Sequence, residues 1–356
     1  MLNRSLSYTQ AINEALAYCL ATYSNTLLIG EGVPDPKGIF NSTLDLQKKF
    51  GKHRVFDMPL AENGMTGVCI GAALTGLRPI MVHQRIDFAL LAMDQLINNA
   101  AKWFFMFNGQ SSVPLVVRLI IGRGWGQGPQ HSQSLQALFS HVPGLKVVMP
   151  VSAYDAKGML ITAIEDDNPV IFIEHRWLHN VVDQVPETDY RVPLDRANIV
   201  TSGSDFTIVA FSLMVVEALK VARVLVRHGI SIEVIDMRSC NPLDMVPVVE
   251  SVRKTGRVMV TDTGTETCGV SSEVITRIIE QAYDSLKCPP IRLAAPNHPV
   301  PTSPFLADDY YIDAEQIAQC ILTRMACDTS TIEPILQALH RTSPRDISAA
   351  DYVGPF

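Results

Sequence analysis

Short apolar runs alternate with longer amphipathic stretches along most of the chain. The apolar runs are rich in β-branched residues and have no polar face, as is typical of strands buried on both sides of a parallel sheet. In the first half they lie at 26–30, 78–82, 113–119, 145–149 and 169–174. Helical periodicity occupies 8–22, 63–77, 88–106 and 153–166. This alternation predicts parallel strands joined by right-handed crossovers.

The alternation stops in a polar stretch with several prolines, at 175–205, and then begins again. The second block has apolar runs at 206–211, 231–237, 257–262 and 291–295, and helical patterns at 213–228, 243–253 and 270–285. We therefore predict an α/β fold with two parallel-sheet, three-layer domains. The predicted parts are a first domain at 1–190, a linker at 191–204, a second domain at 205–325 and a polar tail at 326–356, with one short helix at about 331–341.

Composition narrows the class of protein. With 356 residues, 47% of them hydrophobic, the chain is long enough for two full cores. A net charge of -7 and the lack of a Lys/Arg run argue against nucleic acid as a partner. No long uncharged apolar window suggests a membrane span, and Asn13 and Glu14 interrupt the N-terminal stretch where a signal peptide would be apolar. Together with scattered cysteines, these features predict a cytoplasmic protein that binds neither membrane nor nucleic acid.

Several segments have the composition of a functional site, although each also has a structural explanation. The loop GRGWGQG, 122–128, has glycines at alternate positions, which is not the spacing of a dinucleotide or phosphate loop. Glu62 stands before an apolar helical run, where the helix dipole alone would favour an acid. His131 follows the glycine loop, and Phe88 begins a long helical pattern. Taken singly, these residues leave capping, core and catalytic roles open.

The order and spacing of these segments resemble one family. LLIGEGV, GIFNSTLDLQKKFGKHRVFDMPLAENGMTG, AMDQLINNAAK, QHSQSLQALFSHVPGLKVVMP and DNPVIFIEH are similar to consecutive motifs of the β subunit of the thiamine-diphosphate-dependent decarboxylase component of 2-oxo acid dehydrogenase complexes. The pyruvate, branched-chain and acetoin dehydrogenases belong to this group, within the transketolase-like superfamily. The resemblance extends from about residue 7 to about 325. It implies a pyrimidine-binding domain followed by a transketolase C-terminal-like domain.

The resemblance gives Glu62 a chemical role. Members of the family bind thiamine diphosphate, whose reactive carbon is activated when its aminopyrimidine ring changes tautomer. That change needs a carboxyl group hydrogen-bonded to N1′ of the ring, and Glu62 matches the family's glutamate for this contact. Burial favours the protonated form of such a carboxyl group, so it can share a proton.

Other positions match the family's site residue by residue. Phe88 matches an aromatic residue beside the aminopyrimidine, and Glu31 matches an acid near the cofactor. His131 matches a histidine on the substrate side, where it would assist catalysis. Positions that hold a structural monovalent cation, K⁺, in some members match Leu115, Ala163, Asp166 and Asn168. The resemblance therefore implies catalytic roles for Glu62 and His131 and cofactor binding by Glu31, Glu62 and Phe88.

One expected motif is missing. The family's GDG signature with a following asparagine, which binds Mg²⁺ and the diphosphate, occurs nowhere in this chain. In this family that signature lies on an α-type subunit, so the resemblance implies a shared site in an α₂β₂ assembly. It also implies a small 2-oxo acid as substrate and a lipoyl acyltransferase as acyl acceptor. The alternative is a subunit of a split thiamine-diphosphate carboligase or transketolase-like enzyme, which transfers an acyl or ketol unit to an aldehyde.

The substrate region departs from the family pattern. MVHQR replaces the usual acid after GLRPI and introduces His83 and Arg85. Either these two residues are solvated, or they recognise an acidic or phosphorylated substrate. The segments TDTGTETCG and PNHPVPTS also differ from the family. The sequence does not name the 2-oxo acid.

Overall fold

The computed structural model describes residues 3–124 and 126–347. Within them the chain forms two compact units, one made of 3–122 and 138–194 and the other of 123–137 and 195–347. The sequence placed 123–137 in the first domain, whereas in the structure this segment groups with the second unit.

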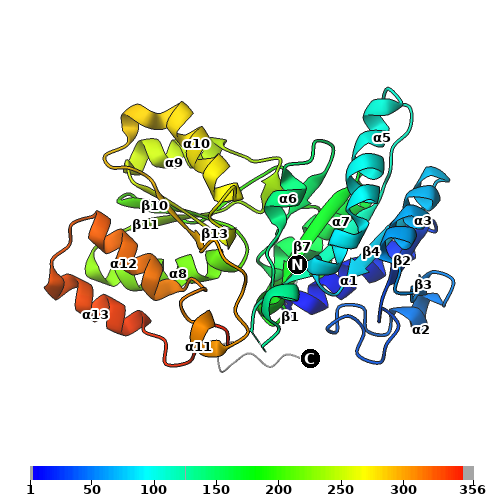
Figure 1. Cartoon of the computed structure of the whole chain (residues 1–356), viewed down its shortest axis with the longest axis horizontal. Helices are drawn as coiled ribbons and strands as arrows, with labels where there is room; N and C mark the ends of the chain where they lie inside the picture. Colours follow the sequence, from blue (N-terminus) through cyan, green and yellow to red (C-terminus); the bar gives the residue numbers. More distant parts are fainter. Residues whose placement is uncertain (1–2, 125, 348–356) are drawn as a thin grey trace. The chain divides into compact units, whose positions relative to one another are not determined.

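The first unit is built on a parallel sheet with the order β6-β7-β5-β4-β2-β3 (Figure 1). Its strands are β2 (Thr26–Gly30), β3 (Val55–Phe56), β4 (Arg78–His83), β5 (Val116–Ile121), β6 (Lys146–Val148) and β7 (Val170–His175). The apolar runs thus become the strands, as predicted. β5 begins three residues later than the apolar run because Pro114 lacks the N–H group that a central strand must donate.

Helices cover the sheet of the first unit. α1 (Tyr8–Thr22) and α7 (Ala153–Glu165) pack against each other, and α3 (Glu62–Leu74) packs on β4. The predicted helix at 88–106 is broken into several pieces. They are α4 (Ile86–Ala89), the 3₁₀ turn η1 (Leu90–Ala92), the π-helical turn η2 (Gln95–Ala100) and α5 (Ala101–Met106). Apolar periodicity could not foresee this break, because 3₁₀ and π turns each differ from an α-helix by less than about one residue per turn.

Smaller elements complete the first unit. They are β1 (Asn3–Ser7), α2 (Leu46–Phe50), η4 (Arg176–Leu178) and β8 (Val182–Pro186), together with the last three residues of α6 (Gln136–Ser140). β1 and β8 form a separate antiparallel pair. The polar stretch at 175–205 therefore contains strand structure where the sequence suggested only a connection.

The second unit has a five-stranded sheet with the order β14-β13-β10-β11-β9, parallel except for β9 at the edge. Its strands are β9 (Asn198–Thr201), β10 (Phe206–Ala210), β11 (Ile232–Asp236), β13 (Val258–Thr265) and β14 (Ile291–Ala295), with a short β12 (Ser239–Asn241). Its helices are α8 (Leu213–Leu225), α9 (Val246–Thr255), α10 (Val270–Ala282), α11 (Pro304–Ala307), α12 (Ala314–Arg324) and α13 (Thr329–Leu339), with 3₁₀ turns η3 (Gly128–Gln130), η5 (Val226–His228) and η6 (Tyr283–Ser285). α9 and α10 pack together on one face, and α8, α12 and α13 pack together on the other (Figure 1). Both units are thus three-layer α/β structures, as predicted.

The segment predicted as a polar tail contains a helix that packs on the second unit. Asp328 caps α13 by accepting a hydrogen bond from Thr331 N at 2.9 Å, and Ile335 is fully buried. Amphipathic packing of this kind stabilises a short helix that would be marginal alone. Residues 348–356 of the predicted tail lie outside the described part of the chain. Across 3–124 and 126–347, no helix is both long enough and apolar enough to span a membrane.

Candidate active site

Three side chains lie at the carboxyl ends of neighbouring strands in the first unit. Glu31 follows β2, Asp57 follows β3, and His83 is the last residue of β4. The register pairs Gly30 with Val82, so Glu31 and His83 leave the sheet side by side. The carboxyl edge of an open parallel sheet is the usual place for a ligand.

Glu62 is buried at the start of α3. The residue is 8% exposed and is the first residue of the helix, after an N-cap, Ala61, that has no side-chain hydrogen bond. Thr66 Oγ1 donates to the Glu62 carbonyl oxygen at 2.7 Å, within the first turn. The positive end of the helix stabilises the charged carboxylate there. This effect does not require burial. The helix dipole therefore explains why an acid stands at this position, but not why the acid is buried.

Glu31 lies close enough to Glu62 and Asp57 to interact with both. Burial raises the pKa of Glu31, and the neighbouring carboxylates of Glu62 and Asp57 raise it further. Asp57 is held in place because Gly32 N donates to its Oδ1 at 2.9 Å. Glu31 Oε1 is buried and accepts no hydrogen bond from the residues that the structure describes. A buried carboxylate oxygen without a donor is costly, so this edge is complementary to a ligand with N–H groups.

The other candidates of this edge lie on β4 and α4. Phe88 is partly buried on α4. His83 and Arg85 are 3% and 6% exposed, so the interpretation of both as solvated residues is wrong. Burial lowers the pKa of His83 to about 4, which makes its imidazole neutral near pH 7. Arg85 donates to the Gln84 carbonyl oxygen at 3.2 Å and lies over the ring of Phe40.

Sequence reasoning missed a buried ionic cluster between β5 and the end of β7. Arg118 and Glu174 are fully buried and form a bidentate pair, at 2.6 and 3.0 Å. Burial acts to raise the pKa of Glu174, but attraction by Arg118 and hydrogen bonds from His179 and Arg118 outweigh it and hold the pKa at about 2. Arg118 also donates to Ser42 Oγ at 3.0 Å, which ties the loop before α2 to the sheet. The sequence contained one signal for this pair: each of two otherwise apolar strands carries a charged residue, Arg118 in one and Glu174 in the other.

His131 lies in the second unit, on the segment Arg123–Ala137. The side chain is exposed. Its segment is attached to β13 of the same unit, since Gln136 Nε2 donates to Asp262 Oδ1 at 2.6 Å and Ser134 Oγ lies 2.8 Å from Thr263 Oγ1. These long-range bonds explain why the segment groups with the second unit.

The predicted cation residues gather at the opposite, amino edge of the first sheet. Leu115 precedes β5, Asn168 precedes β7, and Ala163 and Asp166 lie at the end of α7. Arg78 donates to the carbonyl oxygens of Ile164 and Asp166, at 3.1 and 3.0 Å. Lys146 forms an ion pair with the Asp166 carboxylate. A monovalent cation would therefore compete with two cationic side chains for the oxygens of Asp166.

Side chains that could chelate a metal ion are not grouped in the described parts of the chain. Neither 3–124 nor 126–347 holds a set of three or more His, Cys, Asp and Glu side chains with the required arrangement. The K⁺ site, which would rest on carbonyl oxygens, stays a prediction.

Family comparisons agree with this architecture. Residues 4–180 match the transketolase pyrimidine-binding domain, and residues 195–317 match the transketolase C-terminal domain. Among solved structures, the fold is similar to a split-gene transketolase in an inactive β₄ tetramer, with a TM-score of 0.71 over 94% of this chain and 99% of the other. At 21% identity, this similarity concerns the fold alone.

Characterised relatives are closer in sequence. The β subunit of acetoin:2,6-dichlorophenolindophenol oxidoreductase from Cupriavidus necator is 41% identical over 88% of this chain and 96% of that protein. The β subunit of the pyruvate dehydrogenase E1 component from Bacillus subtilis is 40% identical over 84% and 92%, and the 2-oxoisovalerate dehydrogenase β subunit from the same organism is 38% identical over 88% and 96%. From its two domains and these relatives, the chain belongs to the transketolase-like family of 2-oxo acid dehydrogenase E1 β subunits.

Proposed function

We propose that this chain is the β subunit of a thiamine-diphosphate-dependent 2-oxo acid dehydrogenase and provides the aminopyrimidine side of a shared active site. Membership of the E1 β family implies use of this cofactor. The observation that carries the proposal for this chain's own residues is the pair of interacting acids, Glu62 and Glu31, at one sheet edge.

The two acids fit an aminopyrimidine. Its ring nitrogen and exocyclic amino group can accept and donate hydrogen bonds, and Glu31 Oε1 is a buried acceptor without a donor in the described structure. Glu62 would hold a proton at its carboxyl group and share it with N1′ of the ring. Thiamine diphosphate, when bound, supplies a nucleophilic carbon that adds to the 2-oxo group of the substrate. Phe88 would pack beside the ring, and exclusion of water there would strengthen the hydrogen bond from Glu62.

His131 would act on the substrate side. An imidazole can donate a hydrogen bond to the carboxylate or the 2-oxo oxygen of such a substrate. The exposed position of His131 on a loop of the second unit leaves its ring accessible. The proposed substrate is a small 2-oxo acid, and the proposed acceptor is the lipoyl group of an acyltransferase.

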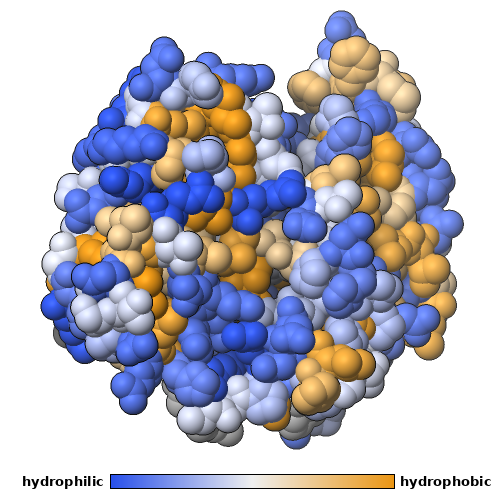
Figure 2. Space-filling model, turned by 60° about the vertical axis from the view of Figure 1, so that its left-hand side comes forward, coloured by the Kyte–Doolittle hydropathy of each residue, from blue (hydrophilic) through white to orange (hydrophobic). Residues whose placement is uncertain are grey.

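An α-type partner would supply what this chain lacks. The β-subunit names of the relatives imply such a partner. We propose that it holds the diphosphate and Mg²⁺ and that the assembly is α₂β₂. The exposed end of α5 supports an interface, because residues 104–107 are consecutive, apolar and exposed, with Phe105 at 88% (Figure 2). An obligate interface of this kind buries more than roughly 2,000 Å².

Calorimetry tests the shared site. The isolated chain should bind thiamine diphosphate with Mg²⁺ weakly and should not decarboxylate 2-oxo acids. Addition of the α-type subunit should produce tight binding and turnover together. Tight cofactor binding and full activity of the isolated chain would contradict the proposal.

Sedimentation with a surface variant tests the interface. Phe105→Asp should weaken assembly with the α-type subunit at least about tenfold, since a charge would be buried among apolar groups. Tyr283→Asp is the matched control, because Tyr283 is 69% exposed in the second unit. Equal assembly of both variants would exclude the end of α5 from the interface.

A substrate screen tests the acceptor. Transfer to a lipoyl domain should exceed transfer to aldehydes such as acetaldehyde or glycolaldehyde. Preferential ketol transfer to an aldehyde would support the transketolase-like alternative instead. No observation on this chain favours that alternative at present, since the split transketolase is similar in fold alone.

A further inference from the structure

The segment that carries His131 is also attached at its beginning. Arg123 is 4% exposed, and its NH1 donates to the Ile312 carbonyl oxygen at 3.3 Å. Its guanidinium lies 4.7 Å from the centre of the Tyr311 ring. Ser132, next to His131, lies beside Tyr311 as well and lowers the pKa of its hydroxyl, although burial, the larger effect, raises it. Tyr311 and Ile312 therefore support both Arg123 and the neighbour of His131.

Tyr311 and Ile312 lie in a short irregular stretch, 308–313, between α11 and α12. Backbone bonds attach the first part of this stretch to α11, where Tyr310 N and Tyr311 N donate to the Ala307 carbonyl oxygen at 3.1 and 3.3 Å, so side-chain hydrogen bonds are needed chiefly for the rest. The carboxylate of Asp313 caps α12 by accepting from Gln316 N at 3.0 Å, and Glu217 accepts from Ala314 N at 3.0 Å. These bonds fix only the last residue of the stretch.

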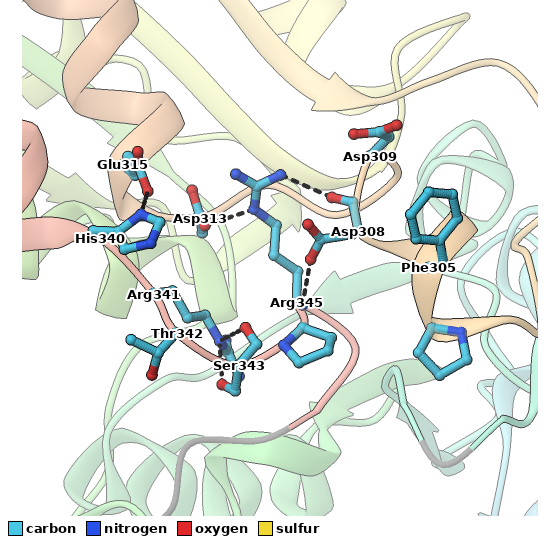
Figure 3. Close-up of a pocket in the computed structure, with 12 residues that line it drawn as sticks. Phe305, Asp308, Asp309, Asp313, Glu315, His340, Arg341, Thr342, Ser343 and Arg345 are labelled. Atoms are coloured by element: carbon cyan, nitrogen blue, oxygen red, sulfur yellow. Dashed lines mark hydrogen bonds and ion pairs between the residues drawn. The ribbon is translucent and has the colours of Figure 1, made fainter.

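Arg345, from the segment after α13, joins the two ends of this stretch (Figure 3). Its Nε donates to Asp313 Oδ2 at 2.6 Å, and its NH1 donates to the Asp308 carbonyl oxygen at 2.8 Å. Its backbone N–H donates to Asp308 Oδ1, also at 2.8 Å. The guanidinium is largely shielded, with a side-chain exposure of 17%, and Asp313 is buried. Charge-assisted bonds in such surroundings are stronger and better defined than those on an open surface.

The neighbouring residue Asp346 extends this link to Arg123. Asp346 is 4% exposed, burial raises the pKa of its carboxyl group, and the charge of Arg123 opposes that rise. Burial lowers the pKa of Arg123 to about 10, so Arg123 is still a cation near pH 7. The C-terminal segment thus interacts with the 123–137 segment electrostatically as well as through 308–313.

We propose that Arg345 is a positioning residue: by holding the shape of 308–313 it fixes the segment Arg123–Ala137 and thereby the location of His131. The catalytic part of this inference rests on the proposed function, because it assumes that His131 acts on the substrate. The structural part, coupling between the C-terminal segment and the His131 segment, does not depend on the reaction.

Hydrogen exchange and kinetics of the full chain test the coupling. In Arg345→Ala, amides of 123–137 and 308–313 should exchange about tenfold faster, because their local opening becomes easier. In the assembled enzyme, KM for the 2-oxo acid should rise or kcat should fall about tenfold. The affinity for thiamine diphosphate should stay within about twofold, since Glu62 belongs to the other unit. A general loss of stability would instead change the exchange rates, the kinetic constants and the cofactor affinity together.

His340→Ala is the matched control. His340 lies in the same C-terminal segment but contacts Glu315 at 3.0 Å, whereas Arg345 makes the bonds to Asp308 and Asp313 (Figure 3). In His340→Ala, the amide exchange rates at 123–137 and the kinetic constants should stay within about twofold of wild type. Arg345→Lys should show only part of the increase in exchange and of the kinetic loss. Its single ammonium group can pair with Asp313 but lacks the planar fork that also reaches Asp308.

Two outcomes would overturn the proposal. One is faster exchange at 340–347 in Arg345→Ala with wild-type exchange at 123–137. If the alanine variant does not fold, the test uses the milder Arg345→Lys. Wild-type exchange at 123–137 in that variant is the second outcome. Coupling in exchange together with normal turnover of His131→Ala would contradict the catalytic role of His131 and leave the coupling intact.

Discussion

The acids at the carboxyl edges of the two parallel sheets have different neighbours. In the first unit, Glu31 and Glu62 interact with each other, and Glu31 Oε1 has no hydrogen-bond partner in the described structure. In the second unit, the corresponding acid is Asp262 on β13, which is fully buried. Its Oδ1 accepts a bond from Gln136, while its Oδ2, like Glu31 Oε1, has no partner in the described structure. In our proposal the carboxylates of the first edge face a ligand, whereas a segment of the chain itself covers the acid of the second edge.

This contrast shows that the α/β architecture alone does not define an active site. Both edges have the position where open sheets bind ligands. What differs is the presence of a covering segment, since 123–137 lies across β13 in the second unit. Function therefore has to be inferred from the side chains and from what covers them.

The largest expected effect distinguishes the proposed catalytic role of Glu62 from that of an ordinary acid at a helix start. Glu62→Gln should reduce turnover of the assembled enzyme by roughly 10²–10⁴, because an amide cannot share the proton of the aminopyrimidine. The melting temperature should change little. Glu273→Gln is the matched control, since Glu273 also lies in the first turn of a helix, α10, but is exposed. Turnover of Glu62→Gln within about twofold of wild type would exclude the role.

The second prediction concerns the buried ion pair of the first unit. Arg118→Ala should destabilise that unit by about 3–5 kcal/mol, because Glu174 would be left buried without its cation. Amide exchange of β5 and β7 in denaturant would measure the loss. Arg277→Ala breaks an exposed i,i+4 pair on α10 of the second unit and should cost less than about 1 kcal/mol. Equal costs would mean that water reaches the Arg118 site.

A third prediction uses the titration of His83. Its pKa is about 4 in the folded chain and 6.5 when unfolded, so the unfolded state binds the proton first. Stability of the first unit should then decrease as pH falls from about 6.5 to about 4, by about 3 kcal/mol in total at about 1.4 kcal/mol per pKa unit. His83→Gln should flatten this part of the curve. An unchanged pH profile would show that His83 is hydrated and already titrates normally.

The sequence predicted most of the fold because its strands are buried on both faces. Runs such as 26–30 and 206–211 are continuously apolar, and they correspond to β2 and β10. The position of Glu62 at a helix start was also readable, since it separates a strand pattern from an apolar helical pattern. Local periodicity and helix-start signals were sufficient for these features.

The rest depends on contacts between distant residues. Nothing near Gln136 in the sequence indicates Asp262 as its partner, and nothing near Arg345 indicates Asp308. The sequence indicated a short helix in the segment after 325 but not what attaches the polar residues behind it, where Arg345 forms charge-assisted bonds. Composition measures average polarity, whereas a single well-placed side chain can attach a segment.

The smallest expected effect completes the comparison of the two edges. Burial raises the pKa of Asp262, and hydrogen bonds from Gly264, Gln136 and Thr263 only partly oppose it. A carboxyl group with a raised folded pKa stabilises the fold below its unfolded pKa and loses that contribution as pH rises through the folded one. The ionised form of Asp262 is therefore disfavoured in the folded state. Asp262→Asn keeps an acceptor for Gln136 and should change the stability of the second unit by less than about 1 kcal/mol, toward greater stability. Gln136→Ala is the control and should destabilise it by about 1–3 kcal/mol, because the buried carboxylate loses its donor. Thermal melts at pH 7 measure both variants. Strong destabilisation by Asp262→Asn would mean that the charge of Asp262 is itself needed at this edge.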